Sequence, residues 1–300
     1  MFLRAISFVC VVQAFFLSAA CMLVSSSDGT KIYANAVGNP SNPGMVIIHG
    51  LMLSGTVFDD VVNDVRLTSL FYLVTYDMRG HGQSDKPSSA ADYTSRLFAD
   101  DFAAVSKAFG LKSPVVVGWS YGGTVFSDIF TNLPAGSVSG LVGIAALPYT
   151  GMTSLGVNTP TSLAYLTGVF IDDDVPTYIN SKVAFVDSLF NNPQNVPAET
   201  KWEWLGTAVT QLPSVTTFLL NRPQDPSALY AAGALGLPLL LMAGTNDKVV
   251  LNDVIINATA SHFTKVQVRR IQGGSHSLFY DNKDECILWL ITFMVTIRQS

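Results

Sequence analysis

Short apolar runs separated by turns recur along the chain and predict the strands of a buried sheet. Between them, apolar residues recur at helical spacing, as in Phe98, Phe102, Val105 and Phe109, which predict a helix that ends at Gly110. The predicted strands lie at 31–37, 45–48, 71–76, 114–117, 141–147 and 239–242, and an alternating run at 266–268 predicts an edge strand. The chain therefore alternates strands with helices, which favours an α/β fold.

Between residues 148 and 236 this alternation stops, and prolines and asparagines become frequent. Aromatic residues scatter through helical patches of this segment: Tyr149, Phe170, Tyr178, Phe185, Phe190, Trp202, Trp204 and Phe218. We interpret most of them as the segment's own small core, and a minority as facing a substrate. The predicted organisation is a core of residues 21–147 and 237–300, interrupted by a cap at 148–236.

A candidate nucleophile follows the apolar run 114–117 in the sequence Gly118-Trp119-Ser120-Tyr121-Gly122. A tight turn from a strand into a helix leaves no room for side chains two positions from the serine, so it requires small residues there. Gly118 and Gly122 meet this requirement, and spaced apolar residues after the turn predict a helix. A bare pattern of this kind also occurs by chance, but the preceding strand and the following helix favour a nucleophile elbow that exposes Ser120.

A serine hydroxyl requires a histidine base and an orienting carboxylate. Of the four histidines, His49 and His81 belong to earlier loops and His262 precedes an edge strand, whereas His276 lies in a loop of small residues that leaves that strand. Asp247 follows the buried strand 239–242 and lies between nucleophile and base in chain order. We therefore predict a triad of Ser120, Asp247 and His276. Other acids in the interval lack a core strand before them and are predicted to be solvated: Asp172, Asp173, Asp174 and Asp253.

From about Cys21 onward the chain resembles the α/β-hydrolase superfamily, in particular its serine esterases and cofactor-free haloperoxidases. The resemblance rests on the elbow, on His49-Gly50-Leu51 after a strand, and on the loop Asp77-Met78-Arg79-Gly80-His81-Gly82-Gln83-Ser84-Asp85. It implies an eight-stranded, mostly parallel sheet with helices on both faces and a cap inserted after the sixth strand. It also implies an oxyanion hole formed by the backbone amides of Leu51 and Tyr121, and a structural role for the loop that contains His81.

Composition limits the partners of such an enzyme. The formal net charge is −5 and no cluster of Lys and Arg is present, so nucleic acid is not expected as a partner. The cysteines at positions 10, 21 and 286 lack metal-ligand spacing, so no metal site is predicted. A triad with two backbone donors needs no cofactor. Low charge and abundant aromatic residues favour a small-molecule substrate with a small to medium apolar acyl or alcohol group.

The predicted function is hydrolysis of a carboxylic ester through an acyl-serine intermediate. The same residues would serve three alternatives: a haloperoxidase-like perhydrolase, a carbon-carbon bond hydrolase, and a ligand receptor without catalysis. A serine at the elbow disfavours the epoxide hydrolases and haloalkane dehalogenases of this superfamily, which use an aspartate there. Oligomeric state is left open by the sequence.

The first twenty residues have the charge, apolar stretch and small-residue exit of a secretory signal peptide. Residues 5–24 are also about long enough to anchor the chain in a membrane if they are not removed. A glycosylation sequon at Asn257-Ala258-Thr259 fits a secretory route. We expect a secreted protein, with a cytoplasmic one as the alternative.

Overall fold

The computed structural model describes residues 20–299, which form one eight-stranded sheet. The strand order is β1-β2-β4-β3-β5-β6-β7-β8, and β2 runs antiparallel to both β1 and β4 while the remaining pairs are parallel. The strands are β1 (Ala20–Ser25), β2 (Lys31–Val37), β3 (Gly44–Ile48), β4 (Tyr72–Tyr76), β5 (Val115–Trp119), β6 (Gly140–Ile144), β7 (Leu239–Gly244) and β8 (Val266–Ile271). The predicted leader lies outside the described residues, apart from Ala20.

The apolar runs lie where both faces of the sheet are covered. Every residue of β4, β5, β6 and β7 is buried, which explains why these strands are continuous apolar runs without alternation. β6 ends three residues before the predicted Leu147, because Ala145 has a φ of 46° and the chain turns there. The predicted α/β fold is confirmed.

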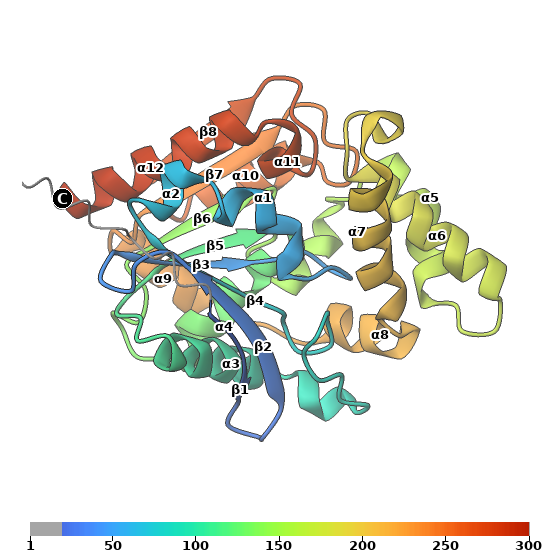
Figure 1. Ribbon diagram of the computed structural model, residues 1–300, viewed down its shortest axis with the longest axis horizontal. Coiled ribbons are helices and arrows are strands. Elements are labelled where there is room, and N and C mark those ends of the chain that lie inside the picture. The colour runs from blue at the N-terminus through green and yellow to red at the C-terminus, as the bar shows by residue number, and fades with distance from the viewer. Residues whose placement is uncertain (1–19, 300) are drawn as a thin grey trace, which may run out of the picture.

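Helices cover both faces of the sheet (Figure 1). One layer contains α3 (Ser95–Ala108), α4 (Val125–Asn132) and α9 (Ser227–Ala234), and the other contains α1 (Asp59–Val62), α2 (Val65–Thr68), α11 (Leu278–Asp281) and α12 (Lys283–Gln299). α10 (Asn252–Ala260) packs against β7. Across residues 20–299 no helix is both long and apolar enough to cross a membrane.

Four helices follow β6 and stand together beside one end of the sheet, at the right of Figure 1. They are α5 (Pro160–Leu166), α6 (Val175–Ser188), α7 (Ala198–Thr210) and α8 (Pro213–Asn221), and we call them the inserted helices. Phe185, Phe190 and Trp204 are buried, as expected for a small core of this segment, whereas Trp202 is 68% exposed. The predicted cap runs from 148 to 236 and so includes α9, which packs against α4 in the core layer. The bounds of the cap stay a prediction.

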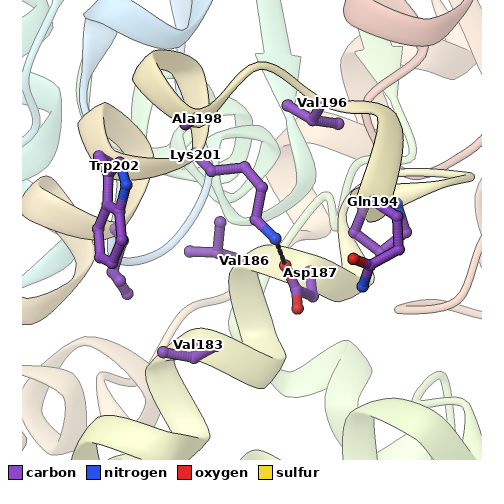
Figure 2. Close-up of a pocket in the computed structure, with 10 residues that line it drawn as sticks. Val183, Val186, Asp187, Gln194, Val196, Ala198, Lys201 and Trp202 are labelled. Carbon is purple, nitrogen blue, oxygen red and sulfur yellow. Dashed lines mark ion pairs between the residues drawn. The ribbon is translucent and has the colours of Figure 1, made fainter.

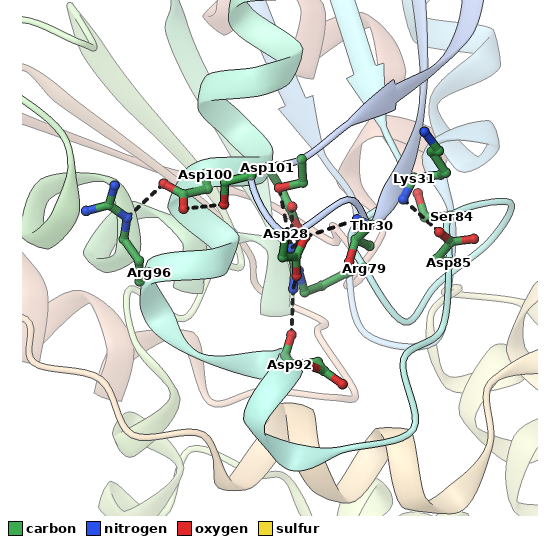
Figure 3. A network of polar contacts seen from close by, with 12 residues as sticks. Asp28, Thr30, Lys31, Arg79, Ser84, Asp85, Asp92, Arg96, Asp100 and Asp101 are labelled. Atoms are coloured by element: carbon green, nitrogen blue, oxygen red, sulfur yellow. Dashed lines mark hydrogen bonds and ion pairs between the residues drawn. The ribbon is translucent and has the colours of Figure 1, made fainter.

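The loop after β4 is tied to the core by charged groups (Figure 3). The guanidinium of Arg79 is fully buried and donates to both carboxylate oxygens of Asp101 at 2.7 and 2.8 Å, and to Asp28 at 2.9 Å. Asp77 accepts from the backbone amides of Gly55 and Gln83, each at 2.7 Å. These bonds agree with the structural role that the resemblance implied for this loop.

Candidate active site

Ser120 lies where β5 passes into a short 3₁₀ helix, η3 (Ser120–Thr124). Its φ is 52°, a left-handed conformation that non-glycine residues adopt rarely and at a cost. A β-carbon at Gly122 would lie 2.4 Å from the carbonyl oxygen of Ile48, and one at Gly118 would lie 2.7 Å from the backbone of Gly123. The glycines that flank Ser120 are therefore required by space, as the elbow prediction assumes.

The predicted base and acid lie together. His276 Nδ1 and Asp247 Oδ2 are 2.8 Å apart, and both side chains are almost fully buried. Asp247 follows β7 and His276 follows β8, which pair in parallel, so the ends of both strands lie at the same edge of the sheet. The bond requires a proton on Nδ1 of the neutral imidazole, which leaves Nε2 as the acceptor.

Four donors hold the Asp247 carboxylate. Oδ1 accepts from the amides of Val249 and Val250 at 2.8 and 3.0 Å, and Oδ2 accepts from the Asn252 side-chain amide at 2.9 Å as well as from His276. Burial acts to raise the pKa of Asp247, but the imidazole and the amide bonds outweigh it and the pKa is lowered. The carboxylate is therefore ionised at neutral pH. Asn252 was not predicted from the sequence, because a single asparagine at the start of a helix carries no distinctive pattern.

Trp119, the residue before Ser120, connects the elbow to the loop that carries His276. The indole Nε1 of Trp119 donates to the His276 carbonyl at 2.9 Å, and the two rings lie 5.5 Å apart between centroids. For the described part of the chain the structure gives no direct hydrogen bond between Ser120 and His276. Bonds between nucleophile and base are often loose without substrate and tighten when it binds.

The two predicted oxyanion donors, Leu51 and Tyr121, belong to segments that adjoin the serine. Tyr121 is the second residue of η3, where a helix leaves backbone N–H groups without internal partners. The loop that carries Leu51 packs against the elbow, because a β-carbon on Gly50 would lie 3.2 Å from the Ser120 β-carbon. Tyr121 and Gly50, the residue before Leu51, therefore lie beside Ser120, and the oxyanion role of the two amides stays a prediction.

His49 and His81 are buried but differ from His276. Nδ1 of His49 contacts the Gly50 carbonyl at 2.8 Å, and Nε2 accepts from the Met78 amide at 3.0 Å, so both nitrogens are occupied by backbone. Burial lowers the pKa of His49 and lowers that of His81 well below its usual value. Both stay neutral at pH 7. His262 is exposed and stacks on Tyr230, with ring centroids 3.9 Å apart.

The segment after α8 reaches the elbow through Arg222, a second residue that sequence reasoning missed. Arg222 donates to the Tyr121 hydroxyl at 2.8 Å, to Asp128 at 2.8 Å and to Thr124 at 2.9 Å. Arg222 and Asp128 are almost completely buried, and both Tyr121 and Asp128 follow Ser120 along the chain. Because long-range pairing of this kind leaves no sequence motif, only the fold reveals it.

The inserted helices also contact the site through an aromatic cluster. Trp204 of α7 lies 6.1 Å from Trp119, 4.7 Å from Phe190 and 6.2 Å from Phe279 between ring centroids. A separate hollow of about 300 Å³ lies between α6 and α7, lined by Val183, Trp202 and the Lys201–Asp187 ion pair among others (Figure 2). It does not include Ser120, Asp247 or His276, so we do not assign it to the candidate reaction.

The described residues contain no group of three or more His, Cys, Asp or Glu placed to hold a metal ion. Cys286 is buried on α12, and Cys21 is exposed on β1. Neither lies in the candidate triad.

Comparison with protein families identifies the fold. A model described as the alpha/beta hydrolase fold matches residues 43–283. The chain belongs to this family. The solved structure of the esterase RhEst1 from Rhodococcus sp. ECU1013 superposes on this alpha/beta hydrolase with a TM-score of 0.80 and 27% sequence identity, covering 92% of this chain and 99% of the esterase. A bromoperoxidase from Bacillus anthracis gives a TM-score of 0.75 at 21% identity, covering 92% of this chain and 99% of its own, and supports the fold alone.

Curated relatives match shorter stretches of this alpha/beta hydrolase. The protein named "Probable oxidoreductase EphD" from Mycobacterium tuberculosis strain H37Rv is 41% identical over 95 residues, which make up 32% of this chain and only 16% of that protein. A non-heme chloroperoxidase from Streptomyces lividans is 32% identical over 125 residues, which are 42% of this chain and 44% of the relative. The shared stretches therefore cover well under two thirds of either relative.

Proposed function

We propose that this protein is a serine hydrolase that cleaves a carboxylic ester of a small to medium apolar substrate through an acyl-serine intermediate. The observation that carries the proposal is the buried 2.8 Å contact between His276 and Asp247, beside a serine held at a positive φ. A histidine with one nitrogen committed to a carboxylate and the other available is the arrangement that a serine nucleophile requires.

In this mechanism the Ser120 hydroxyl attacks the ester carbonyl carbon while His276 Nε2 accepts its proton. The developing oxyanion accepts hydrogen bonds from the backbone amides of Leu51 and Tyr121. The C–O bond of the ester then breaks, and the alcohol leaves with the proton from His276. A water molecule attacks the acyl-serine in the same manner, releasing the carboxylic acid and restoring Ser120. Asp247 holds the tautomer of His276 and stabilises the imidazolium that forms.

The surroundings of the site favour an apolar body for the substrate. Trp119, Trp204 and Phe279 form adjoining aromatic faces from the core and the inserted helices. The esterase RhEst1, whose fold covers nearly the whole chain, is named for the same class of bond. In this proposal the inserted helices form the cap over the reacting ester.

Perhydrolysis is the second candidate, because the chloroperoxidase of Streptomyces lividans shares 32% identity over 125 residues. Hydrogen peroxide would then replace water in attacking the acyl-serine and give a peracid. Assays of the purified protein with p-nitrophenyl esters of rising chain length, with and without peroxide and bromide, separate the two. Ester turnover without peroxide supports hydrolysis, whereas halogenation that needs peroxide and a carboxylic acid supports perhydrolysis.

The nucleophile itself is tested by labelling and substitution. A fluorophosphonate should modify Ser120, and peptide mass analysis should locate the label there. Ser120→Ala should lower kcat by about four to six orders of magnitude while the fold is kept, because nucleophile and base act as a unit. Ser127, which is buried and donates to the Pro148 carbonyl at 2.7 Å, offers the control substitution Ser127→Ala. Label on another serine, or an active Ser120→Ala protein, would refute the assignment.

A further inference from the structure

Lys182 is a buried cation with no anion beside it in the described part of the chain. It lies on α6 and its side chain is fully buried at the contact with the core, where Nζ lies 2.9 Å from the sulfur of Met52 and 4.9 Å from the centre of the Tyr178 ring. A thioether sulfur is only a weak acceptor. Over residues 20–299, no carboxylate comes within ion-pair distance of Lys182.

His81, in the loop after β4, is a second buried group with an unsatisfied nitrogen. His81 donates from Nδ1 to the Arg79 carbonyl, at 3.1 Å, so its Nε2 carries a lone pair. That Nε2 is buried and has no hydrogen-bond partner among the residues that the structure describes. Burial lowers the pKa of His81 well below its usual value, and the charges of His49, Lys86 and Lys182 add smaller effects in the same direction. Two buried polar groups from different parts of the chain thus lack full partners among the described residues.

Lys182 adjoins the candidate reaction centre through Met52. Met52 directly follows Leu51, the candidate oxyanion donor, and has a φ of 65°, so the backbone there is held in an unfavourable conformation. A buried ammonium without a counter-ion is costly, and a methionine or leucine of similar length would cost less. Unsatisfied groups of this kind need a physical explanation, and a missing ligand group supplies one.

We propose that Lys182 binds an anionic group, a carboxylate, on the substrate, and that the ester cleaved at Ser120 therefore combines an apolar body with one carboxylate. This proposal rests on the proposed ester hydrolysis. The ammonium would donate to the carboxylate, which gives it an anionic partner in place of the weak thioether acceptor of Met52. Charge-assisted hydrogen bonds are stronger than neutral ones, so the carboxylate would contribute substantially to substrate affinity.

The charge of Lys182 depends on pH in the working range. Burial lowers its pKa to about 7. Tyr178 of its own helix faces it and is neutral at pH 7, and the buried His81 of the loop after β4 is neutral as well. Within the described chain, no acid of α5 or α7 forms an ion pair with it. The free protein should therefore hold the ammonium below about pH 7 and lose it above, and carboxylate binding should weaken as pH rises.

Two pairs of esters test the proposal, because the carboxylate could lie on either side of the ester bond. Ethyl valerate and monoethyl glutarate differ by a carboxylate on the acyl chain, and phenyl acetate and 4-acetoxybenzoate differ by one on the alcohol. For each pair, the ratio of kcat/KM for the anionic ester to kcat/KM for the neutral one is measured by product chromatography from pH 6 to 8.5. Forming the ratio removes the pH dependence of the chemical step that both esters share.

We expect Lys182→Met to lower this ratio by at least about tenfold in one pair, mainly through KM. The ratio should fall with rising pH in the unchanged protein and become independent of pH in Lys182→Met. Lys182→Arg should restore part of it. The matched control is Lys201→Met on the neighbouring helix α7, whose ammonium pairs with Asp187 at 2.6 Å in the hollow of Figure 2, and it should leave the ratio unchanged.

Ratios that Lys182→Met leaves unchanged in both pairs would overturn the carboxylate site, as would failure of the unchanged protein to cleave either anionic ester. If Lys182→Met does not fold, Lys182→Gln is measured in the same way. Ser120→Ala separates this result from the proposed function: loss of all turnover in that protein with unchanged ratios in Lys182→Met refutes the carboxylate site alone. Turnover that survives in Ser120→Ala refutes the ester mechanism itself.

Discussion

The core and the inserted helices meet at the candidate site, but they hold their residues by different means. On the core side, backbone contacts fix the elbow: Gly122 lies so close to the Ile48 carbonyl that no side chain fits, and two backbone amides hold Asp247 Oδ1. In the inserted helices, long side chains reach toward the core: Trp204 packs near Trp119, and Lys182 contacts Met52. In the proposed mechanism the core would set the geometry of the reacting groups, and the inserted helices would set what surrounds the substrate.

This contrast implies that the two sides tolerate substitution differently. A change that disturbs backbone positions should act on kcat, because small displacements of reacting groups are costly. A change in a side chain of the inserted helices should act on KM, specificity or stability.

The largest effect should follow removal of the acid's charge on the core side. Asp247→Asn keeps the shape of the side chain but favours the wrong tautomer of His276, and should lower kcat by about four orders of magnitude. The control is Asp253→Asn, an exposed acid paired with Arg270 at 2.7 Å. Activity within about tenfold of the parent would break the comparison, since the orienting acid would then come from the inserted segment, where Asp172 to Asp174 are candidates.

A pair of glycines compares the two sides directly. Gly122→Ala would bring a methyl group to 2.4 Å from one backbone carbonyl and 2.5 Å from the next, and should lower kcat by about a hundredfold by displacing the elbow. Gly206→Ala lies in α7 with nothing within 4 Å of the new methyl group, and should raise the free energy of unfolding by about 0.5–1 kcal/mol without loss of kcat. Urea unfolding and steady-state kinetics measure both, and equal losses of kcat would contradict the distinction.

The core side of the candidate site could be predicted from the sequence, because backbone contacts fix its geometry. Steric demands on backbone leave a pattern, so the spacing of Gly118 and Gly122 around Ser120 identified the elbow, and a buried strand before Asp247 separated it from other acids. The fold class is confirmed, and each predicted strand is present, although β6 ends at Ile144 and not at Leu147. Triad and oxyanion roles remain predictions that the geometry supports.

The contacts that the inserted helices and Arg222 make with the core could not be predicted in this way. Arg222 and Lys182 look like ordinary helix-surface residues in the sequence, because their partners lie 94 and 130 positions away. Aromatic composition indicated a small core in this segment, but not that Trp204 would pack against the residue before the nucleophile. Such contacts depend on how the segment docks, which local patterns do not encode.

Arg222 offers a test of how firmly that docking is held. Arg222→Met leaves Asp128 buried without its cation, and should lower the free energy of unfolding by about 3–5 kcal/mol. Arg270→Met removes an ion pair whose side chains are 50% and 74% exposed, and should cost less than about 1 kcal/mol. Urea denaturation of both proteins provides the comparison. Similar losses would mean that the buried network does not tie the segment to the elbow.

Asn252 gives the smallest expected effect and sharpens the comparison, because it is a core residue that acts through its side chain. Its amide donates to the same Asp247 oxygen that His276 contacts. A carboxylate with one donor fewer keeps its proton to higher pH, which reduces the lowering of the Asp247 pKa. Asn252→Ala should therefore lower kcat by about tenfold and move the acid limb of the pH–rate profile to higher pH.

Asn246→Ala is the control, since that side chain bonds to Asn191 and not to the acid. A fall in kcat with an unmoved pH profile would mean that Asn252 only supports the local fold, and the core side would then rest on backbone contacts and the triad alone.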